Sequence, residues 1–529
     1  EKTSMTDSLV WILLAFAVYM CVMIVIGARY AKQTKNSEDY FLGGRNLNGW
    51  VAALSAQASD MSGWLLMGLP GSVYAFGTGQ AWIAVGLFIG TVCNWLVVSS
   101  RLRRYTICAD NALTFPSYLE NRFHDKKQIL LVASSVVIVI FFLVYTASAL
   151  TAGGKLFASV FGIDYTVALT IGAAVILIYT FLGGFMAVCV TDFIQGMLML
   201  AGILCVPIVA YVLVGPQNVI SLIGESGVAG GASSFLNIMQ DSGSQVSPVY
   251  VISQLAWGLG YFGMPHILVR FMAVSSEKEL KKSKVIAIIW VALSLSAAIF
   301  IGILGRAYLY PTILGETTDI STEYVFIEMI KQVFTQDLHL AFIGGLFLRG
   351  ILAAIMSTAD SQLLVTASSV AEDLFKGVFR KDASDKTVLR VSRATVVIVA
   401  VVAYIIALNP KSSVMGLVSN AWAGFGAAFG PIVLLSLYWK RVNLPGAIAG
   451  IVSGAAAVLV WDYIPMFATG VMDEKGKEIV NTLATQTGLY SLVVGFGIGL
   501  ILIVVVSLLT EKPSDEMMQE FEAMKNMDI

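Results

Sequence analysis

Thirteen stretches of about 20 apolar residues determine what this chain can fold into, because a run of that length spans a bilayer as an α-helix. Only 13% of the 529 residues are charged, against roughly 25% in soluble domains. Alternating segments typical of β-barrels are absent, so we expect an all-α integral membrane protein with thirteen transmembrane helices in a single domain, 1–529. The stretches lie near 8–29, 48–75, 79–100, 129–152, 165–185, 190–214, 247–272, 284–310, 339–373, 391–409, 413–439, 445–468 and 486–510.

The Lys and Arg residues predict how the helices are oriented. About three quarters of the 33 basic residues follow odd-numbered stretches or lie in the tail 511–529, and basic loops stay in the cytoplasm. We therefore expect a multi-pass protein of the cell membrane with its N-terminus outside and its C-terminus in the cytoplasm. The first stretch lacks the basic start and cleavage site of a signal peptide and is predicted to be a retained span. Nothing in the sequence indicates nucleic-acid binding or an obligate protein partner.

The second and seventh stretches carry signals that break a helix. The second has Asp60, Ser62 and Gly63 at its centre and Pro70 further on, and the seventh reads GLGYFGMP over 258–265. Glycine and proline interrupt a membrane helix and free backbone groups that can bind ions. Two broken helices five spans apart predict a five-plus-five inverted repeat, with core repeats about 48–214 and 247–439 and a ligand site between the breaks.

The remaining segments are predicted to surround this core. Helices 8–29, 445–468 and 486–510 would be peripheral. The external loops 215–246 and 463–485 would be caps or gates, and the first could instead be a disordered linker.

Carboxylates and hydroxyls mark the candidate ion site. A carboxylate at bilayer depth costs about 2.5–3.5 kcal/mol, so Asp60 is expected to handle an ion or a solute. In the ninth stretch, Ala354 and Thr358 share one helix face, and Ser357, Asp360 and Ser361 line the adjacent one. Hydroxyl, carboxylate and carbonyl oxygens are the ligands that a hard cation such as sodium prefers. The alternative is that these hydroxyls bond the helix backbone.

Two other charged residues have open interpretations. Asp192 follows Thr191 near the start of the sixth stretch, where it could cap the helix or bind a cation. Arg349 lies inside the ninth stretch, and we expect its side chain to reach water or a carboxylate rather than a substrate.

Aromatic residues near the breaks are candidates for a solute pocket. Tyr145, Trp257 and Tyr261 lie centrally in their stretches, whereas interfacial anchors lie at the ends. The GLGYFG sequence at 258–263 matches a dinucleotide fingerprint, but that motif needs a soluble βαβ unit, so we reject it. The five cysteines and three histidines are scattered, which predicts neither a disulfide framework nor a histidine-based metal site.

At these residues the chain resembles the sodium/solute symporter family, and within it the bacterial members that carry proline. The resemblance covers nearly the whole chain. The matching stretches are SEDYFLGGRNL (37–47), ALSAQASDMSGWLLMGLPG (53–71), NALTFPSYLENRF (111–123), YTFLGGFMAVCVTDFIQ (179–195), WGLGYFGMPHILVRFM (257–272), ILAAIMSTADSQLL (351–364) and NAWAGFGAAFGP (420–431).

The resemblance implies a carrier that couples inward sodium movement to uptake of L-proline by alternating access. Its sodium ligands would be main-chain oxygens of Ala58, Met61 and Ala354 and the hydroxyls of Ser357 and Thr358. Asp60 would be the coupling residue. The residues expected to line the substrate pocket are Tyr145, Trp257, Tyr261, Pro265, Ser62 and Gly63.

Members that carry sialic acid imply a second sodium site. Here Asp192, Ser357, Asp360 and Ser361 would form it. Arg349 departs from the family, which implies a small residue at that position.

Alternative functions remain open at this point. The same carrier could import another small amino acid, a carboxylate or an osmolyte, because one or two pocket side chains decide specificity. A channel or a membrane-bound enzyme is disfavoured, since the sequence has no selectivity-filter repeat and no catalytic motif. The expected ligands are therefore sodium and a small solute within a lipid bilayer.

Overall fold

A computed structural model describes residues 2–33, 35–181, 184–309, 322–409, 412–472 and 478–527. In the first half, the elements are α1 (Lys2–Ala31), α2 (Ser37–Leu42), η1 (Gly43–Arg45), α3 (Gly49–Asp60), η2 (Trp64–Gly68), α4 (Leu69–Phe76), η3 (Thr78–Gln80), α5 (Ala81–Cys93), η4 (Asn94–Val98), α6 (Ser99–Cys108), α7 (Phe115–Arg122), α8 (Ile129–Phe161), α9 (Tyr165–Phe181), α10 (Phe185–Val214), η5 (Pro216–Asn218), α11 (Val219–Glu225), α12 (Gly231–Phe235), β1 (Gln240–Asp241) and β2 (Ser244–Gln245).

The second half has α13 (Pro248–Leu255), η6 (Ala256–Gly263), α14 (Pro265–Ala273), α15 (Glu277–Leu309), α17 (Val325–Ile330), η7 (Lys331–Asp337), α18 (Ala341–Ser368), η8 (Ser369–Phe379), α19 (Asp385–Ala407), α20 (Val414–Tyr438), α21 (Leu444–Tyr463), β3 (Pro465–Met472), β4 (Glu478–Thr482), α22 (Leu483–Thr487), α23 (Ser491–Leu509) and α24 (Asp515–Asn526).

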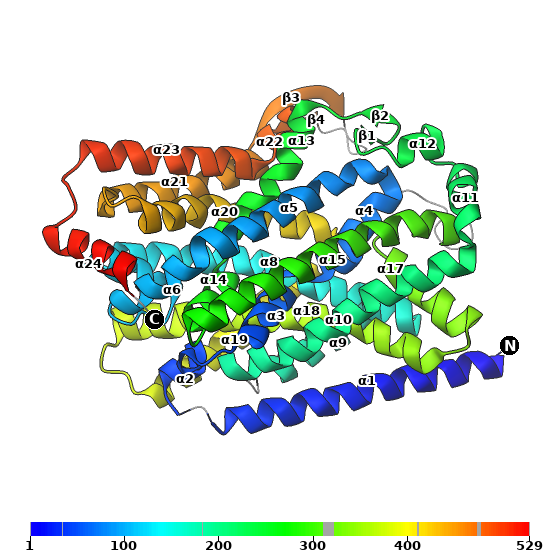
Figure 1. The fold of residues 1–529 in the computed structure, drawn as a ribbon, viewed down its shortest axis with the longest axis horizontal. Coiled ribbons are helices and arrows are strands. Elements are labelled where there is room, and N and C mark those ends of the chain that lie inside the picture. Colours follow the sequence, from blue (N-terminus) through cyan, green and yellow to red (C-terminus); the bar gives the residue numbers. More distant parts are fainter. Residues whose placement is uncertain are drawn as a thin grey trace.

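Long helices run side by side along one axis of the molecule (Figure 1). α1 follows one side of this bundle, and α21 and α23 pack together on the opposite side. The N-terminus lies at one end of the bundle and the C-terminus at the other. α3, α14 and α18 contact one another inside the bundle.

Within the described residues, ten helices are long and apolar enough to cross a membrane. Each corresponds to one of the thirteen predicted stretches. The three others, 48–75, 165–185 and 247–272, do not form a long continuous apolar helix in the described chain. Shorter apolar helices, Trp64–Phe76 and Tyr165–Ile178, lie within the first two of them.

The 48–75 stretch changes direction after Asp60. α3 ends there, and Met61 has ψ 80°, outside the helical range. The chain resumes as the π-helical turn η2 and then α4. The indole N–H of Trp64 and the backbone N–H of Ser62 both donate to the carbonyl oxygen of Asp60 at 3.0 Å, so this carbonyl is satisfied without continuing the helix.

The 247–272 stretch contains three elements. Between η6, which is a 3₁₀ helix, and α14, Met264 adopts an extended conformation with ψ 105°. Proline disfavours a helical conformation in the residue before it, so Pro265 accounts for this geometry. Gly260 brings η6 so close to α20 that a Cβ atom there would overlap the Trp422 ring. Glycine is therefore required for this packing.

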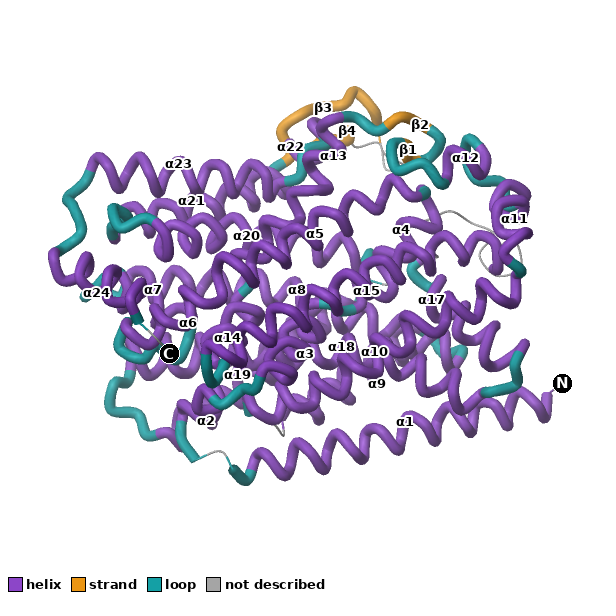
Figure 2. The backbone as a smooth tube through the Cα atoms, in the orientation of Figure 1, coloured by secondary structure: helices purple, strands orange, loops and turns teal. Residues whose placement is uncertain are grey.

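The described chain is mainly helical, as expected, and also contains four short strands. β1 with β2, and β3 with β4, form two small antiparallel hairpins in the segments predicted to be external loops (Figure 2).

The predicted helix 445–468 ends at Tyr463, because Ile464 precedes Pro465 and becomes extended. The predicted helix 486–510 begins at Ser491, because Gly488 ends α22 in a left-handed conformation. Segment 215–246 contains α11, α12 and a hairpin, and is not a plain linker.

Candidate functional site

Asp60 is fully buried at the end of α3. Its Oδ2 atom accepts a 2.7 Å hydrogen bond from the hydroxyl of Tyr261 on η6. Its Oδ1 atom has no hydrogen-bond partner among the described residues. The ends of the two predicted breaks are therefore joined by one hydrogen bond, and one carboxylate oxygen is left to interact with something else.

Oxygen atoms from α3 and α18 meet beside Asp60. The hydroxyl of Ser357 donates to the carbonyl of Ala58 at 2.7 Å and to the carbonyl of Ala354 at 3.0 Å. The hydroxyl of Thr358 donates to the same Ala354 carbonyl at 3.1 Å. Met61 is the first residue after α3. The structure thus joins Ala58, Ala354, Ser357 and Thr358 directly, all of them candidate sodium ligands, and places Met61 at the adjacent break.

A second polar cluster surrounds Arg270 of α14. Its Nη2 atom donates to Asp192 Oδ2 at 3.1 Å and to the hydroxyl of Ser361 at 2.6 Å. Ser55 donates to the same Asp192 oxygen at 2.7 Å and accepts from Arg270 Nε at 3.0 Å. Asp360 contacts Ser361 at 3.5 Å. Asp192, Asp360 and Ser361 therefore belong to one cluster.

This second cluster corrects one expectation and adds one residue. α10 begins at Phe185, so Asp192 lies inside the helix and the capping interpretation was wrong. Arg270, to which sequence reasoning gave no role, is 1% exposed and pairs with Asp192. Its position five residues after Pro265, still within the apolar stretch, was the available signal.

The aromatic candidates form a continuous group of rings. Trp257 stacks on Tyr490 with a 5.2 Å centroid separation and is nearly parallel to Trp422 at 6.3 Å. Tyr261 meets Trp422 edge to face at 5.0 Å. The Trp422 indole donates to the carbonyl of Trp257 at 2.7 Å. Sequence reasoning missed Trp422 and Tyr490 as partners of the predicted pocket residues.

The other predicted pocket residues lie in α8, at the first break and at the start of α14. Tyr145 is fully buried, and its hydroxyl has no partner among the described residues. Gly63 abuts α8, where a Cβ atom would come within 2.8 Å of Ala152. Ser62 lies in the break between α3 and η2, and Pro265 opens α14.

A cavity of about 710 Å³ is lined by two of the aromatic residues, Trp257 and Tyr490. Of the six predicted pocket residues, Trp257 is the one among its lining residues. Gly68 near the first break and the carboxylates of Glu323 and Asp462 also line it. Residues of β4 and α22 also line it, so the cavity extends toward the end of the bundle that carries the hairpins.

Arg349 does not reach water or a carboxylate, and that expectation was wrong. It is fully buried, and its Nη1 atom donates to the carbonyl of Ala15 in α1. Its guanidinium lies 3.7 Å from the ring centroid of Tyr19, which in turn accepts a 2.6 Å hydrogen bond from Gln195. Arg349 therefore attaches α18 to α1 through Ala15 and Tyr19.

Comparison with known proteins agrees with this architecture. The chain is 44% identical to the sodium/proline symporter of Escherichia coli (strain K12), covering 96% of this chain and 95% of that protein. It is 41% identical to the osmoregulated proline transporter OpuE of Bacillus subtilis (strain 168), covering 98% of each. A solved structure of a Na⁺-coupled sialic acid symporter superposes with a TM-score of 0.74 at 20% identity, covering 95% of this chain and 98% of that one. The model of the sodium:solute symporter family matches residues 40–454, so the chain belongs to that family.

Proposed function

We propose that this protein is a sodium-coupled secondary active symporter that imports L-proline by alternating access. The observation that carries the proposal is the meeting of α3 and α18 at Ala58 and Ser357, where carbonyl and hydroxyl oxygens gather at a helix break. The names of relatives at 41% and 44% identity, matched over nearly the whole chain, support proline as the solute.

Sodium, the coupling ion, would bind between α3 and α18. We assign its ligands as the main-chain oxygens of Ala58, Met61 and Ala354 and the hydroxyls of Ser357 and Thr358. These are hard oxygen donors of the kind that alkali and alkaline-earth cations prefer. The Ser357 hydroxyl now donates its proton to carbonyls, and it would turn an oxygen lone pair toward a bound ion.

Proline would bind between the two breaks, next to the sodium. Tyr145, Trp257, Tyr261, Pro265, Ser62 and Gly63 are the residues proposed to line its pocket. Aromatic faces suit the apolar ring of proline, while freed backbone groups at the breaks suit its ammonium and carboxylate. Asp60 would couple the two ligands, because its carboxylate adjoins the proposed ion ligands and bonds Tyr261 of the solute pocket.

A second sodium is proposed at Asp192, Asp360, Ser357 and Ser361. Two buried carboxylates in this cluster face one guanidinium, that of Arg270. Asp192 Oδ1 and Asp360 Oδ2 have no hydrogen-bond partners among the described residues. Another cation would balance the remaining negative charge, since buried charges are costly unless paired.

The finer topology is also a proposal. We infer thirteen crossings, with a five-plus-five inverted repeat at about 48–214 and 247–439 and broken helices 2 and 7. The N-terminus would lie outside and the C-terminus in the cytoplasm of a cell-membrane protein. Membrane-impermeant labelling of single cysteines at Ser244 and Ser514 of intact cells tests the orientation, with Ser244 expected to react and Ser514 to be protected.

Transport is driven by the sodium gradient and the membrane potential. Each positive charge entering the cell contributes about 2.3 kcal/mol per 100 mV, enough to concentrate a neutral zwitterion many-fold. The relatives named above are transporters, so an enzymatic role is not proposed.

Uptake of radiolabelled proline into proteoliposomes tests the function. An inward sodium gradient should drive saturable uptake, and an equal potassium gradient should not. Unlabelled proline should compete better than other amino acids, carboxylates or osmolytes. Better competition by another solute would favour the alternative substrate, and uptake without sodium would overturn the symport mechanism.

A further inference from the structure

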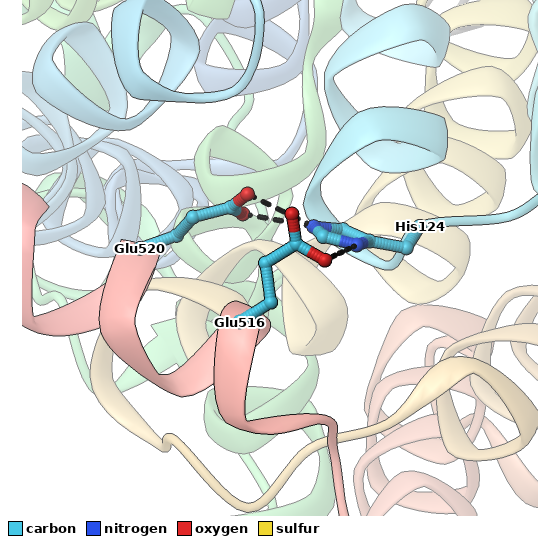
Figure 3. A group of neighbouring side chains, drawn as sticks. All are labelled: His124, Glu516 and Glu520. Atoms are coloured by element: carbon cyan, nitrogen blue, oxygen red, sulfur yellow. Dashed lines mark hydrogen bonds and ion pairs between the residues drawn. The ribbon is translucent and has the colours of Figure 1, made fainter.

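A histidine and two glutamates meet at the end of the bundle opposite the hairpins, far from the proposed transport site. We call this group, His124, Glu516 and Glu520, the His124 cluster (Figure 3). His124 lies in the turn between α7 and α8. Glu516 and Glu520 lie four residues apart on α24, so both side chains project from the same helix face toward the imidazole.

The distances within this cluster suit metal coordination. The Nε2 atom of His124 lies 3.0 Å from both carboxylate oxygens of Glu520. Its Nδ1 atom lies 3.7 Å from Glu516. One ligand atom from each residue falls within 4.8 Å of the others. A metal ion binds one ring nitrogen, and ligands about 2.1 Å from a tetrahedral zinc ion are about 3.4 Å apart. An ion on Nε2 would lie beside Glu520, and the Glu516 side chain, which is 76% exposed, has room to turn toward it.

The surroundings of the cluster carry excess negative charge. A cavity of about 280 Å³ beside His124 and Glu520 is also lined by Asp110, Glu120 and Asp125, and by one base, Lys126. A divalent cation adds two positive charges to this acidic lining, so the local charge favours its binding.

α24 is held in place by other contacts as well. The ring of Phe521 meets Tyr105 edge to face at 6.3 Å, and the guanidinium of Arg122 lies 5.7 Å from the same ring. Because these contacts do not involve the cluster, substitutions in His124 or Glu520 should leave the helix docked.

We propose that His124, Glu516 and Glu520 bind a divalent transition-metal ion of the zinc, cobalt or nickel type, which fastens α24 to the turn between α7 and α8. Imidazole and carboxylate form a mixed nitrogen and oxygen donor set that suits these ions. The site is independent of sodium coupling, and its test does not depend on transport.

Cobalt titration of the purified full chain tests this proposal. The protein is stripped with a chelator in detergent and titrated with Co²⁺ while visible absorption is recorded, and Zn²⁺ is then added as a competitor. One Co²⁺ should bind per chain without a thiolate charge-transfer band, and Zn²⁺ should displace it. His124→Ala and Glu520→Gln should each weaken binding by at least about tenfold, the effect seen even when groups supporting metal ligands are lost.

Two variants serve as matched controls. His339→Ala removes an exposed histidine outside the cluster and should bind cobalt as the parent does. Cys108→Ser removes a thiol near α24 and should also leave binding unchanged. Thermal unfolding in chelator should be the same for all variants. Absence of cobalt binding, binding unaffected by His124→Ala, or loss of binding in either control would overturn the proposal and leave an ordinary ion pair.

Discussion

The hydroxyl of Ser357 donates a 2.7 Å hydrogen bond to the carbonyl oxygen of Ala58, which connects the middle of α18 to the last turn of α3. The same two oxygens are proposed sodium ligands. An ion bound there would replace a direct hydrogen bond with a bridge between the two helices. Sodium binding and the geometry of the first break would therefore depend on each other.

Ser357→Ala should weaken sodium activation of transport. Removing one ligand oxygen is expected to lower sodium affinity by at least about tenfold, or about 1.4 kcal/mol, since even losing a group that supports a metal ligand has that effect. The sodium concentration for half-maximal uptake measures this. Ser368→Ala provides the control, because that hydroxyl donates within its own helix to Val365. Equal effects of both variants would contradict the assigned site.

Asp60→Asn should weaken sodium dependence more than it disturbs folding. The substitution keeps the shape of the side chain and removes its charge, so detergent-solubilised protein should remain monodisperse while sodium activation declines. Tyr261→Phe removes the 2.7 Å hydrogen bond to Asp60 but keeps the Asp60 carboxylate charge. Comparing it with Asp60→Asn therefore separates the effect of the charge from the effect of the hydrogen bond. If Asp60→Asn prevents accumulation of folded protein, its role is structural instead.

Asp360→Ala should reduce the number of coupled ions. With two sodium sites, uptake by the parent protein should show a sodium Hill coefficient approaching about two, and this variant should approach one. The coefficient is obtained from initial uptake rates over a range of sodium concentrations. A coefficient of one in the parent protein would exclude the second site.

Arg349→Met should leave transport nearly unchanged. The guanidinium loses its contacts with Ala15 and Tyr19, but the substitution also removes two buried nitrogens that have no partner among the described residues. Replacing a buried charge by an apolar side chain of similar volume is often neutral or stabilising. Uptake should stay within about twofold of the parent rate, a barrier change of roughly 0.4 kcal/mol.

Arg270→Met, by contrast, should abolish uptake because it leaves the buried Asp192 carboxylate without its guanidinium partner.

Lys155 and Glu323 should stabilise the protein only as a pair. Their buried side chains are 2.5 Å apart, and Glu323 also accepts the N–H of Val414 at 2.9 Å. Glu323→Gln leaves a buried ammonium group unpaired, which typically costs about 3–5 kcal/mol, and should lower the thermal unfolding midpoint. Adding Lys155→Met should recover much of this loss. In the exposed pair Lys525 and Glu522, the substitution Glu522→Gln should have little effect.

The local geometry around the candidate site could be predicted from sequence. Helical periodicity put Ser357 and Thr358 on adjacent faces of one helix, while their grouping as sodium ligands came from the family resemblance. The departures from helix at Met61 and Met264 follow from neighbouring Ser, Gly and Pro residues. These signals act over a few residues. The small hairpins lie in largely exposed segments, and hydropathy does not separate a short exposed strand from the end of a helix. The first four residues of β3 were for this reason included in the predicted helix 445–468.

Long-range partners could not be predicted. Arg270 contacts Asp192 across 78 residues of sequence, and Trp422 bonds Trp257 across 165. Neither pair has a spacing pattern, because the contacts depend on how distant helices pack. The attachment of Arg349 to α1 was missed for the same reason.

Binding measurements with both ligands test the central claim most directly. Equilibrium binding of labelled proline to the purified protein should tighten as sodium is added. Sodium affinity should increase with proline by the same factor, because coupling between two bound ligands is reciprocal. In the parent protein, sodium should raise proline affinity by the same factor by which proline raises sodium affinity. In Ser357→Ala, both of these effects should be much smaller. Proline affinity that does not change between sodium-free and sodium-saturated buffer would contradict it.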